Sequence, residues 1–490
     1  MNFETVIGLE VHAQLLTRSK MFCRCSAGYS DAQANTFVCP VCLGMPGVLP
    51  TINQQAVEYT VMTALALNCT IPGYTKFDRK NYPYPDLMKG YQISQYDAPL
   101  GQGGWLTIWV DGEKKRIGIT RVHLEEDVAK LLHRTSPDGG HYSLVDVNRS
   151  GVPLMEVVGE PDLSSPEEAR QYLIKLRSIL RYLGVSTGNM EEGSFRCDAN
   201  ISIRPEHSAE TMAKAEVKNM NSFRAVFRAL QYEEKRQRKV ASEGKKLVQE
   251  TRGWIEETGK TVSMRSKEYA HDYRYFPEPD LPPLTLSREW VEEVRSRLPE
   301  LPEARRDRLV GEYGLPLYDA NLLTGLKEMA DYFEACLKTE GYRKMPPDSG
   351  AKEVSNWLLG EVSRIMNATG SDIGRFGEQV APERLCELIL FARGVINIAT
   401  AKSVLEEMFK TGRSAADIVA ERGLSQITDS GEIRAEIVSV IKNNAQAVAD
   451  YRAGKTQSLK FLVGQVMKAT KGRANPQVVT ELLRQRLEEE

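Results

Sequence analysis

The sequence predicts an α+β protein in which a β-rich N-terminal part precedes a part that is entirely helical. Short stretches rich in β-branched residues indicate strands near residues 5–12, 105–124 and 194–203. From Ser287 onward the apolar residues repeat at helical spacing, and the proline-dense run 276–283 separates the two patterns. We therefore expect a domain boundary at that run, in a chain whose length suggests roughly two to four domains.

Composition and charge are those of a globular protein. Hydrophobic residues make up 41% of the chain and charged residues 27%, which is enough to form a core. No apolar run of about 18 residues is present, and the first residues lack the segments of a signal peptide, so we expect a cytoplasmic protein without membrane contact. The net charge is -2, so any nucleic-acid binding depends on local basic patches.

The first predicted strand carries Glu10 and His12, which would share one face because side chains alternate across a strand. Leu9 and Val11 would then face the core. A carboxylate beside an imidazole on a rigid strand can bind a metal ion or transfer a proton. The alternative is an edge strand whose polar face is solvated, in which Glu10 and His12 have no catalytic or metal-binding role.

Four cysteines lie close together in the sequence as two pairs, Cys23 with Cys25 and Cys39 with Cys42. Two close pairs joined by a short loop are typical of a structural Zn²⁺ site, in which a closed tetrahedral shell leaves no position for catalysis. The one-residue spacer of the first pair is shorter than usual, and free thiols or redox chemistry are the alternatives. Buried free thiols are expected for the remaining four, Cys69, Cys197, Cys336 and Cys386.

Basic and aromatic residues alternate in the proline-rich loop region 73–100. This mixture suits a nucleotide, because cations bind phosphates and aromatic rings stack on a base, although a well-packed surface loop is also possible. The chain has no GxGxxG motif, and neither Gly-Lys-Thr triplet, 259–261 or 454–456, has a glycine at the required distance upstream. Any ATP must therefore bind outside a standard phosphate-binding loop.

Acidic residues recur on the predicted strands. A hairpin is expected over 105–133 with Asp111 and Gly112 as its turn, and its second strand ends in the three acids 125–127. Asp198 and Glu216 lie on the polar faces of two later strands. Carboxylates gathered from several strands suit Mg²⁺, which prefers oxygen ligands and often shares them with phosphates, whereas a solvated strand end would explain the acidic run by itself.

The first predicted helix has Ser165 as its N-cap and Pro166 at its first position. Glu168 completes a capping box with Ser165. A further helix is expected from about Ser222. Beyond the proline run, helices are expected over 290–298, 322–337, 354–366, 382–393 and 400–410, and a small helical unit over 411–490. Within that unit, residues 455–473 include five basic residues and no acidic one. This run suits contact with an RNA backbone or a solvated helix surface.

Six stretches spread over the chain carry a family resemblance: 4–12, 77–82, 91–95, 191–200, 272–280 and 461–468. On these residues the chain resembles the B subunits of the aspartyl/glutamyl-tRNA(Asn/Gln) amidotransferases, the GatB family. The resemblance implies a mixed-β cradle domain over 1–292 with a Cys₄ zinc site, an all-α helical domain over 293–410, and a tRNA-binding, YqeY-like tail domain over 411–490. The related archaeal E-type protein has a large insertion after the cradle, and its absence after Pro283 favours the bacterial type.

The resemblance also implies a carbon–nitrogen ligase that works as a heterotrimer, in which the partners are the A subunit, an amidase, and the small C subunit. In such an enzyme, ATP phosphorylates the side-chain carboxylate of misacylated Glu-tRNA(Gln), Asp-tRNA(Asn) or both. Ammonia released from glutamine by the amidase then displaces the phosphate and gives the amide.

Six residues are carried over from the resemblance as the catalytic Mg²⁺ site: Glu10, His12, Glu125, Glu126, Asp198 and Glu216. Three basic residues are assigned from charge and context to phosphate or to the aminoacyl end: Lys80, Lys89 and Arg149. The competing hypotheses are a relative of the archaeal E-type protein, a non-catalytic zinc-bearing RNA-binding protein, and an unrelated ATP-grasp-like ligase, for which no motif is found.

Overall fold

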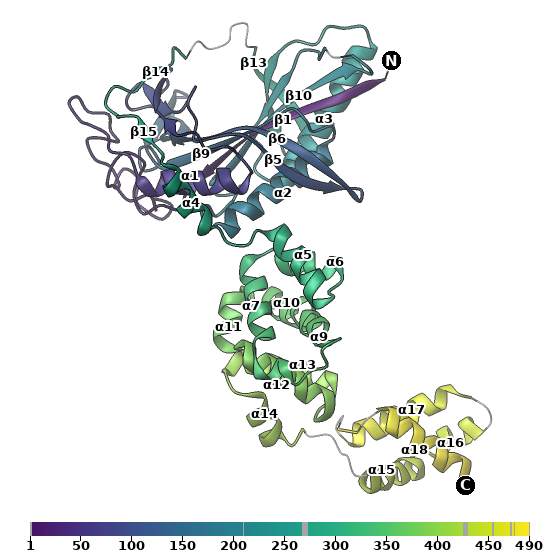
Figure 1. The fold of residues 1–490 in the computed structure, drawn as a ribbon. Coiled ribbons are helices and arrows are strands. Elements are labelled where there is room, and N and C mark those ends of the chain that lie inside the picture. The colour runs from purple at the N-terminus through teal and green to yellow at the C-terminus, as the bar shows by residue number, and fades with distance from the viewer. Residues whose placement is uncertain are drawn as a thin grey trace. The chain divides into compact units, whose positions relative to one another are not determined.

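The structure, a computed structural model, describes residues 2–208, 210–266, 273–424, 430–452, 455–470, 473–474 and 476–489. Contacts divide the chain into two units, Met1–Leu301 and Pro302–Glu490. The first contains the β-sheets and the second is helical (Figure 1), which confirms the predicted α+β class. Asp272 of the stretch 272–280, Gly454 of the second Gly-Lys-Thr triplet, and Lys471 and Gly472 of the run 455–473 lie outside the described residues.

A sheet of eight described strands forms the centre of the first unit. Its spatial order is β13 (Lys260–Ser266), β12 (Glu250–Ile255), β11 (Ala215–Lys218), β10 (Phe195–Pro205), β1 (Phe3–Gln14), β9 (Pro153–Gly159), β6 (Glu113–Glu126) and β5 (Gly101–Val110). Neighbouring strands are antiparallel except for β11 and β12, which are parallel. Because β1 lies between β10 and β9, the edge-strand interpretation of this stretch is wrong.

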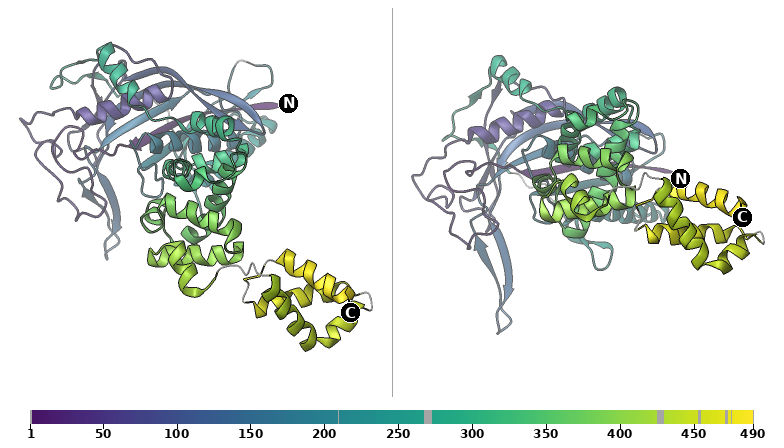
Figure 2. Two further views of the ribbon diagram at one scale, coloured as in Figure 1. Left: turned by 60° about the horizontal axis from the view of Figure 1, so that its bottom comes forward. Right: turned by 90° about the horizontal axis from the view of Figure 1, so that it is seen from below.

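One face of the large sheet is apolar and covered by helices. Along β1, Leu9 and Val11 are buried in the core as expected. The helices α1 (Gln54–Ala66), α2 (Pro166–Tyr182) and α3 (Phe223–Ser242) pack on the sheet, and α2 contacts α3. Figure 2 shows the sheet and its helices in two further views. Leu176 and Leu230 from these helices join the same core. Burying this face leaves the alternate side chains of each strand on the opposite face.

The predicted local signals are largely confirmed in this unit. Ser165 accepts a hydrogen bond from the backbone N–H of Glu168 at 3.1 Å, and Ser222 caps α3 in the same way. The Glu168 carboxylate reaches back to the backbone N–H of Ser164, at 2.7 Å, and so satisfies a donor one residue earlier than a standard capping box does. Asp111 and Gly112 both have positive φ and form the turn between β5 and β6.

A three-stranded sheet lies against the end of β6. Its order is β14 (Phe276–Pro277), β3 (Asp78–Asn81) and β4 (Tyr91–Ser94), and β4 contacts β6. The other elements of the unit are a hairpin of β7 (Lys130–Thr135) and β8 (His141–Asp146), the pair β2 (Tyr74–Thr75) and β15 (Leu284–Thr285), and the helix α4 (Arg288–Ser296).

The second unit begins with helices that enclose one apolar core. They are α5 (Pro302–Tyr313), α6 (Leu317–Thr324), α7 (Lys327–Leu337), α8 (Glu340–Arg343), α9 (Gly350–Trp357), the π-helix η1 (Leu358–Val362), α10 (Ser363–Thr369), α11 (Ile373–Gln379), α12 (Pro382–Gly394), α13 (Ile398–Thr411) and α14 (Ala415–Arg422). The single helix predicted over 322–337 is wrong, because Gly325 ends α6 and Leu326 is extended before α7 begins. The helix predicted over 354–366 contains the π-helical turn of η1.

The last helices have a core of their own. They are α15 (Ser430–Asn443), α16 (Ala445–Arg452), α17 (Gln457–Ala469) and α18 (Pro476–Glu489), and their buried residues include Ile437, Leu462 and Leu483. Ile418 and Val419 of α14 belong instead to the preceding core. The domain boundaries expected at 292/293 and 410/411 stay predictions.

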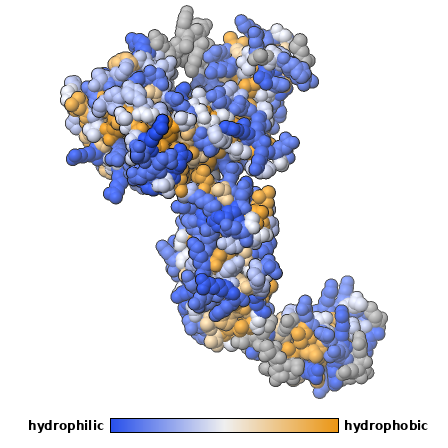
Figure 3. All heavy atoms as spheres, viewed as in Figure 1, coloured by the Kyte–Doolittle hydropathy of each residue, from blue (hydrophilic) through white to orange (hydrophobic). Residues whose placement is uncertain are grey.

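The surface of the molecule is mainly hydrophilic. In Figure 3, hydrophilic residues cover much of the face in view, and hydrophobic residues are exposed in small groups between them. Among the described residues, no helix combines the length and the apolar character that crossing a membrane requires.

A buried charge connects α3 with the far edge of the large sheet. Glu233 on α3 is 0% exposed, and its carboxylate accepts hydrogen bonds from Arg236 at 2.8 Å and from Thr261 on β13, and pairs with Arg252 of β12 at 2.9 Å. Two arginines therefore share one carboxylate that has no access to water, and both also pair with Glu250, Arg236 at 3.4 Å and Arg252 at 2.7 Å.

We expect Glu233→Ala to lower the free energy of unfolding of the first unit by about 3 kcal/mol, the lower end of the cost of breaking a buried ion pair, because Glu250 remains as a second counter-charge for Arg236 and Arg252. The matched surface control is Glu292→Ala, which removes a carboxylate that is 66% exposed and lies 3.1 Å from Arg295. Its effect should stay below about 1 kcal/mol. Urea unfolding followed by tryptophan fluorescence measures both, and equal effects of the two substitutions would contradict the assignment.

Candidate functional site

The polar face of the large sheet holds a cavity of about 390 Å³. Six neighbouring strands each contribute one carboxylate to its wall: Glu10 from β1, Glu125 from β6, Glu156 from β9, Asp198 from β10, Glu216 from β11 and Glu250 from β12. The strand register brings them together, since His12 lies opposite Glu156 and Glu10 lies opposite Asp198. Side chains that are directly opposite in an antiparallel pair share a face, so these residues form rows across the sheet.

The centre of the cavity wall is a group of two carboxylates and an imidazole. His12 Nε2 lies 3.7 Å from Glu125 Oε1 and 3.6 Å from Glu156 Oε2. One donor atom from each of the three residues lies within 4.8 Å of the others, a spacing that fits a shared metal ion. His123 Nε2 lies 3.0 Å from the same Glu156 carboxylate.

The charges of this group are coupled. Burial by itself would raise the pKa of Glu156, but His123 and His12 outweigh burial and hold that pKa well below its usual range. Conversely, burial would lower the pKa of His123, but the charge of Glu156 and a hydrogen bond with Glu125 raise it to about 9. The carboxylates therefore stay ionised against protonated imidazoles.

Glu10 shows that negative charge is in excess. Its pKa is raised, first by burial and then by the charges of Glu156 and Asp198. Glu10 takes up a proton more readily because other carboxylates surround it. A bound cation would stabilise its ionised form. The arrangement therefore favours binding of a divalent cation among these oxygens.

Cations line the opposite part of the cavity. Lys218 Nζ donates a hydrogen bond to Asp198 at 2.7 Å and lies 3.1 Å from Glu216. Burial alone would lower the pKa of Lys80, but the charge of Glu125 outweighs burial and the pKa is raised. Arg121 also lines the cavity, and its buried Nε makes no hydrogen bond within the described part of the chain. These groups can bind the oxygens of a phosphate that enters the cavity.

The structure brings together five of the six residues predicted for the Mg²⁺ site: Glu10, His12, Glu125, Asp198 and Glu216. It does not bring Glu126 into the cavity, because adjacent residues of a strand point to opposite faces. The Glu126 carboxylate pairs with Lys89 and accepts a hydrogen bond from the backbone N–H of Ile93 at 3.0 Å. Both Glu126 and Lys89 line a separate cavity of about 220 Å³ next to Cys23 and Cys42.

Of the three predicted phosphate-binding residues, only Lys80 lines the carboxylate cavity. Lys89 is engaged by Glu126. Arg149 donates hydrogen bonds to the backbone carbonyls of Val128 at 2.8 Å and Ala129 at 2.9 Å. Its guanidinium therefore fixes the chain that follows β6 and does not face the cavity.

Sequence reasoning missed Glu156, His123, Lys218 and Arg121. A signal existed for His123, because it lies two residues before Glu125 on a predicted strand and so had to share its face. Glu156 stands inside an apolar stretch of β9. Only the pairing of β9 with β1 and β6 shows that its side chain lies between the two histidines.

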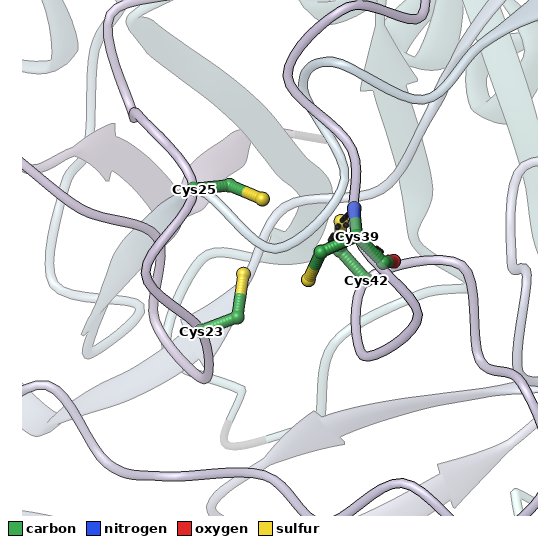
Figure 4. A group of neighbouring side chains, drawn as sticks. All are labelled: Cys23, Cys25, Cys39 and Cys42. Atoms are coloured by element: carbon green, nitrogen blue, oxygen red, sulfur yellow. Dashed lines mark hydrogen bonds between the residues drawn. The ribbon is translucent and has the colours of Figure 1, made fainter.

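The four clustered cysteines converge in space. Figure 4 shows Cys23 and Cys25 on one segment and Cys39 and Cys42 on another, with their sulfur atoms turned towards a common centre. One sulfur from each lies within 4.8 Å of the others. The cluster offers a four-thiol metal site, as the spacing predicts.

A buried lysine accompanies this cluster. Lys20 is fully buried and donates a hydrogen bond to the backbone carbonyl of Val147 at 3.2 Å. The pKa of the Cys42 thiol falls to about 4, mainly through its hydrogen bond with Cys23 and also through the backbone N–H of Cys39 and the charge of Lys20. At Cys42 the surroundings thus favour thiolate, the form that binds metal ions, whereas the hydrogen bond with Cys42 raises the pKa of Cys23 and burial raises that of Cys25.

Comparison with known proteins agrees with the resemblance. Residues 5–292 match the family model of the GatB/GatE catalytic domain, and residues 331–487 match that of the GatB domain. The chain is 64% identical over 488 residues to the B subunit of the aspartyl/glutamyl-tRNA(Asn/Gln) amidotransferase of Dehalococcoides mccartyi strain CBDB1, covering 99% of each chain. The B subunit of the same enzyme from Thermomicrobium roseum is 58% identical over 490 residues, which cover 100% of this chain and 99% of that one.

The fold and its acidic cavity therefore define a catalytic domain of the GatB/GatE class. Within that class, full-length identity shows that the chain belongs to the family of aspartyl/glutamyl-tRNA(Asn/Gln) amidotransferase B subunits. The family expected from the sequence is confirmed.

Proposed function

We propose that this chain is the B subunit of a tRNA-dependent amidotransferase and that the carboxylate cavity is where the amino acid on the tRNA is activated. The enzyme is a ligase that uses ATP and glutamine to convert Glu-tRNA(Gln), Asp-tRNA(Asn) or both into the amide forms. An amidase, the A subunit, and the small C subunit complete the proposed heterotrimer. The observation that carries the assignment of the site is the group of His12, Glu125 and Glu156 within the cavity.

The reaction explains why such a cavity is needed. The side-chain carboxylate of the aminoacyl group is a poor electrophile, and its oxygen attacks the γ-phosphorus of ATP while the bond to ADP breaks. Ammonia then attacks the carbonyl carbon of the acyl phosphate, phosphate leaves, and the nitrogen loses a proton to give the amide. Phosphoryl transfer requires positioning and charge neutralisation more than covalent help from the protein.

The residues of the cavity fit Mg²⁺ and a polyphosphate. Glu125, Glu156 and His12, once His12 has released its proton, would hold Mg²⁺, and Glu10 and Asp198 line the same cavity. When bound, Mg²⁺ would neutralise the charge that develops on the phosphate oxygens. Lys80, Lys218 and Arg121 would contact the remaining oxygens, because their charged groups line the same cavity.

The competing hypothesis of a non-catalytic RNA-binding protein leaves this cavity unexplained. Removing several charged groups from water is costly, and structures keep such groups where they act on a ligand or on one another. Here carboxylates from six strands surround one cavity together with two histidines and several cations, which a purely structural role would not require.

We expect Glu156→Gln, in the complex with the A and C subunits, to lower tRNA-dependent ATP hydrolysis and amidation by about a hundredfold or more, because the substitution removes a charged ligand of the proposed Mg²⁺ that neutralises the phosphate. Glutaminase activity of the amidase should remain. The matched control is Glu160→Gln on the chain just after β9, where Glu160 accepts a hydrogen bond from Thr120 outside the cavity. ATP hydrolysis at the wild-type rate in the Glu156 variant would show that the cavity is not the activation site.

We also propose that the four-cysteine cluster holds a structural Zn²⁺. Four sulfurs around one point give the closed tetrahedral shell that structural zinc sites use. The buried charge of Lys20 would offset part of the negative charge of a zinc ion bound by four thiolates.

Protein purified without chelators should contain one zinc ion per chain by elemental analysis. Cys42→Ser should lose that zinc and unfold at a lower temperature, because metal binding contributes folding free energy. Cys386→Ala is the control, since Cys386 is buried in the second unit and its loss should leave the zinc content unchanged. Wild-type protein without zinc would disprove the assignment.

We propose that the last four helices contact the tRNA backbone. Lys455, Lys460 and Lys468 are exposed on or next to α17, in the run that has no acidic residue. Phosphate contacts of this kind contribute affinity that decreases as salt increases, because each contact releases counterions.

The double substitution Lys460→Glu and Lys468→Glu should raise the KM for aminoacyl-tRNA. It should also reduce the slope of log binding constant against log salt concentration by about one unit for each phosphate that is no longer bound. Glutaminase activity should not change. Arg484→Glu, an exposed charge reversal on α18 outside the run, serves as the control. Unchanged tRNA affinity over a salt titration of the double variant would contradict the proposal.

A further inference from the structure

We propose that Tyr96 and Tyr275 form a platform on which an adenine base stacks at the mouth of the carboxylate cavity. The inference rests on the proposed function and adds a binding site to it. Adenine enters the proposed reaction from two sources, ATP and the 3′-terminal adenosine of the aminoacyl-tRNA, and both present the same aromatic surface.

The two rings already form a parallel stack. Their centroids are 4.2 Å apart and their planes differ by 12°. Both side chains line the cavity that contains Glu125 and Glu156. Tyr273 contacts the edge of this stack, with its ring centroid 6.0 Å from that of Tyr275. The platform thus forms part of the cavity wall.

Hydrogen bonds hold the backbone on both sides of the stack. The backbone N–H of Tyr96, two residues after β4, donates to the buried carboxylate of Asp78 at 3.1 Å. Asn81 at the end of β3 donates to the backbone carbonyl of Arg274 at 2.9 Å and, through its own N–H, to that of Tyr273 at 2.8 Å. The middle strand of the small sheet therefore positions both rings.

Arg274 carries the backbone strain that this position requires. Its φ of 42° lies in the left-handed region, which residues other than glycine seldom adopt. Such conformations persist only where the surroundings enforce them, and they cluster at ligand sites. Here the two hydrogen bonds from Asn81 enforce the conformation between Tyr273 and Tyr275.

The exposure of Tyr96 distinguishes a binding platform from simple packing. Its side chain is 57% exposed although it is stacked, whereas Tyr275 beneath it is half-buried. A ring that served only the core would be covered. Lys80 lies between the rings and the carboxylates, with Nζ 4.9 Å from the centroid of Tyr273. When a base stacks on Tyr96, Lys80 therefore lies between that base and the carboxylates. There Lys80 can bind the phosphate or ribose that is attached to the base.

The test substitutes Tyr96 in the complex with the A and C subunits and measures kcat and KM for ATP and for aminoacyl-tRNA. Tyr96→Leu should raise one of the two KM values about 5- to 150-fold, the range expected when one base loses its aromatic stack. Tyr96→Phe and Tyr96→Trp, which keep an aromatic ring, should leave that KM close to the wild-type value. Tyr142→Leu is the control, because Tyr142 is a 50% exposed tyrosine on the β7–β8 hairpin and does not line the cavity.

The result also identifies the source of the base. A raised KM for ATP assigns the platform to the nucleotide, and a raised KM for aminoacyl-tRNA assigns it to the terminal adenosine. Wild-type KM values for both substrates in Tyr96→Leu overturn the inference, as does an equal change in Tyr142→Leu. Failure of the proposed function looks different, since the wild-type complex itself would then show no tRNA-dependent ATP hydrolysis.

A binding measurement tests the platform without turnover. In Tyr96→Trp, the new indole should be quenched on addition of ATP, or on addition of tRNA but not of tRNA that lacks its terminal adenosine. Tyr142→Trp should show no such change with either probe. Absence of quenching by both ATP and intact tRNA in Tyr96→Trp overturns the inference.

Discussion

The pairing of β1 with β9 and β10 is the constraint on which the rest of the first unit depends. This register sets His12 opposite Glu156 and Glu10 opposite Asp198, so that charged groups from separate parts of the chain share one wall. The alternate residues of β1 are buried under α2 and α3. A slip of one residue would exchange the two faces, placing carboxylates in the core and apolar groups in the cavity. Core packing and site geometry are therefore fixed together.

The end of β6 links the carboxylate cavity with the cysteine cluster. Glu125 faces His12, whereas its neighbour Glu126 faces Lys89 in the cavity beside Cys23 and Cys42. The four-cysteine segments are long and irregular, and a metal ion would give them the rigidity that they cannot obtain from hydrogen-bonded strands. Glu126 at the end of β6 lines one cavity with Cys23 and Cys42, and β4 of the small sheet contacts β6.

Much of the local structure could be predicted because its causes are local. Ser165 and Ser222 cap helices, and Asp111 with Gly112 forms a hairpin turn, since each signal acts within a few residues. The helix expected over 322–337 failed for the same kind of reason, because its apolar spacing continues through Gly325 although the backbone is extended at Leu326. Periodicity predicts which face is buried, but it does not show where a helix is interrupted.

The sequence by itself determined the family, the α+β class and the sharing of one face by Glu10 and His12, because strand alternation has a period of two residues. Tertiary structure decided which residues meet across the sheet. It brought Glu156 and His123 to His12 and turned Glu126 away to Lys89. It also stacked Tyr96, which follows β4, on Tyr275, which precedes β14, the two strands on either side of β3. These contacts depend on strand register and order, which long-range packing selects and a single sequence does not encode in any local pattern.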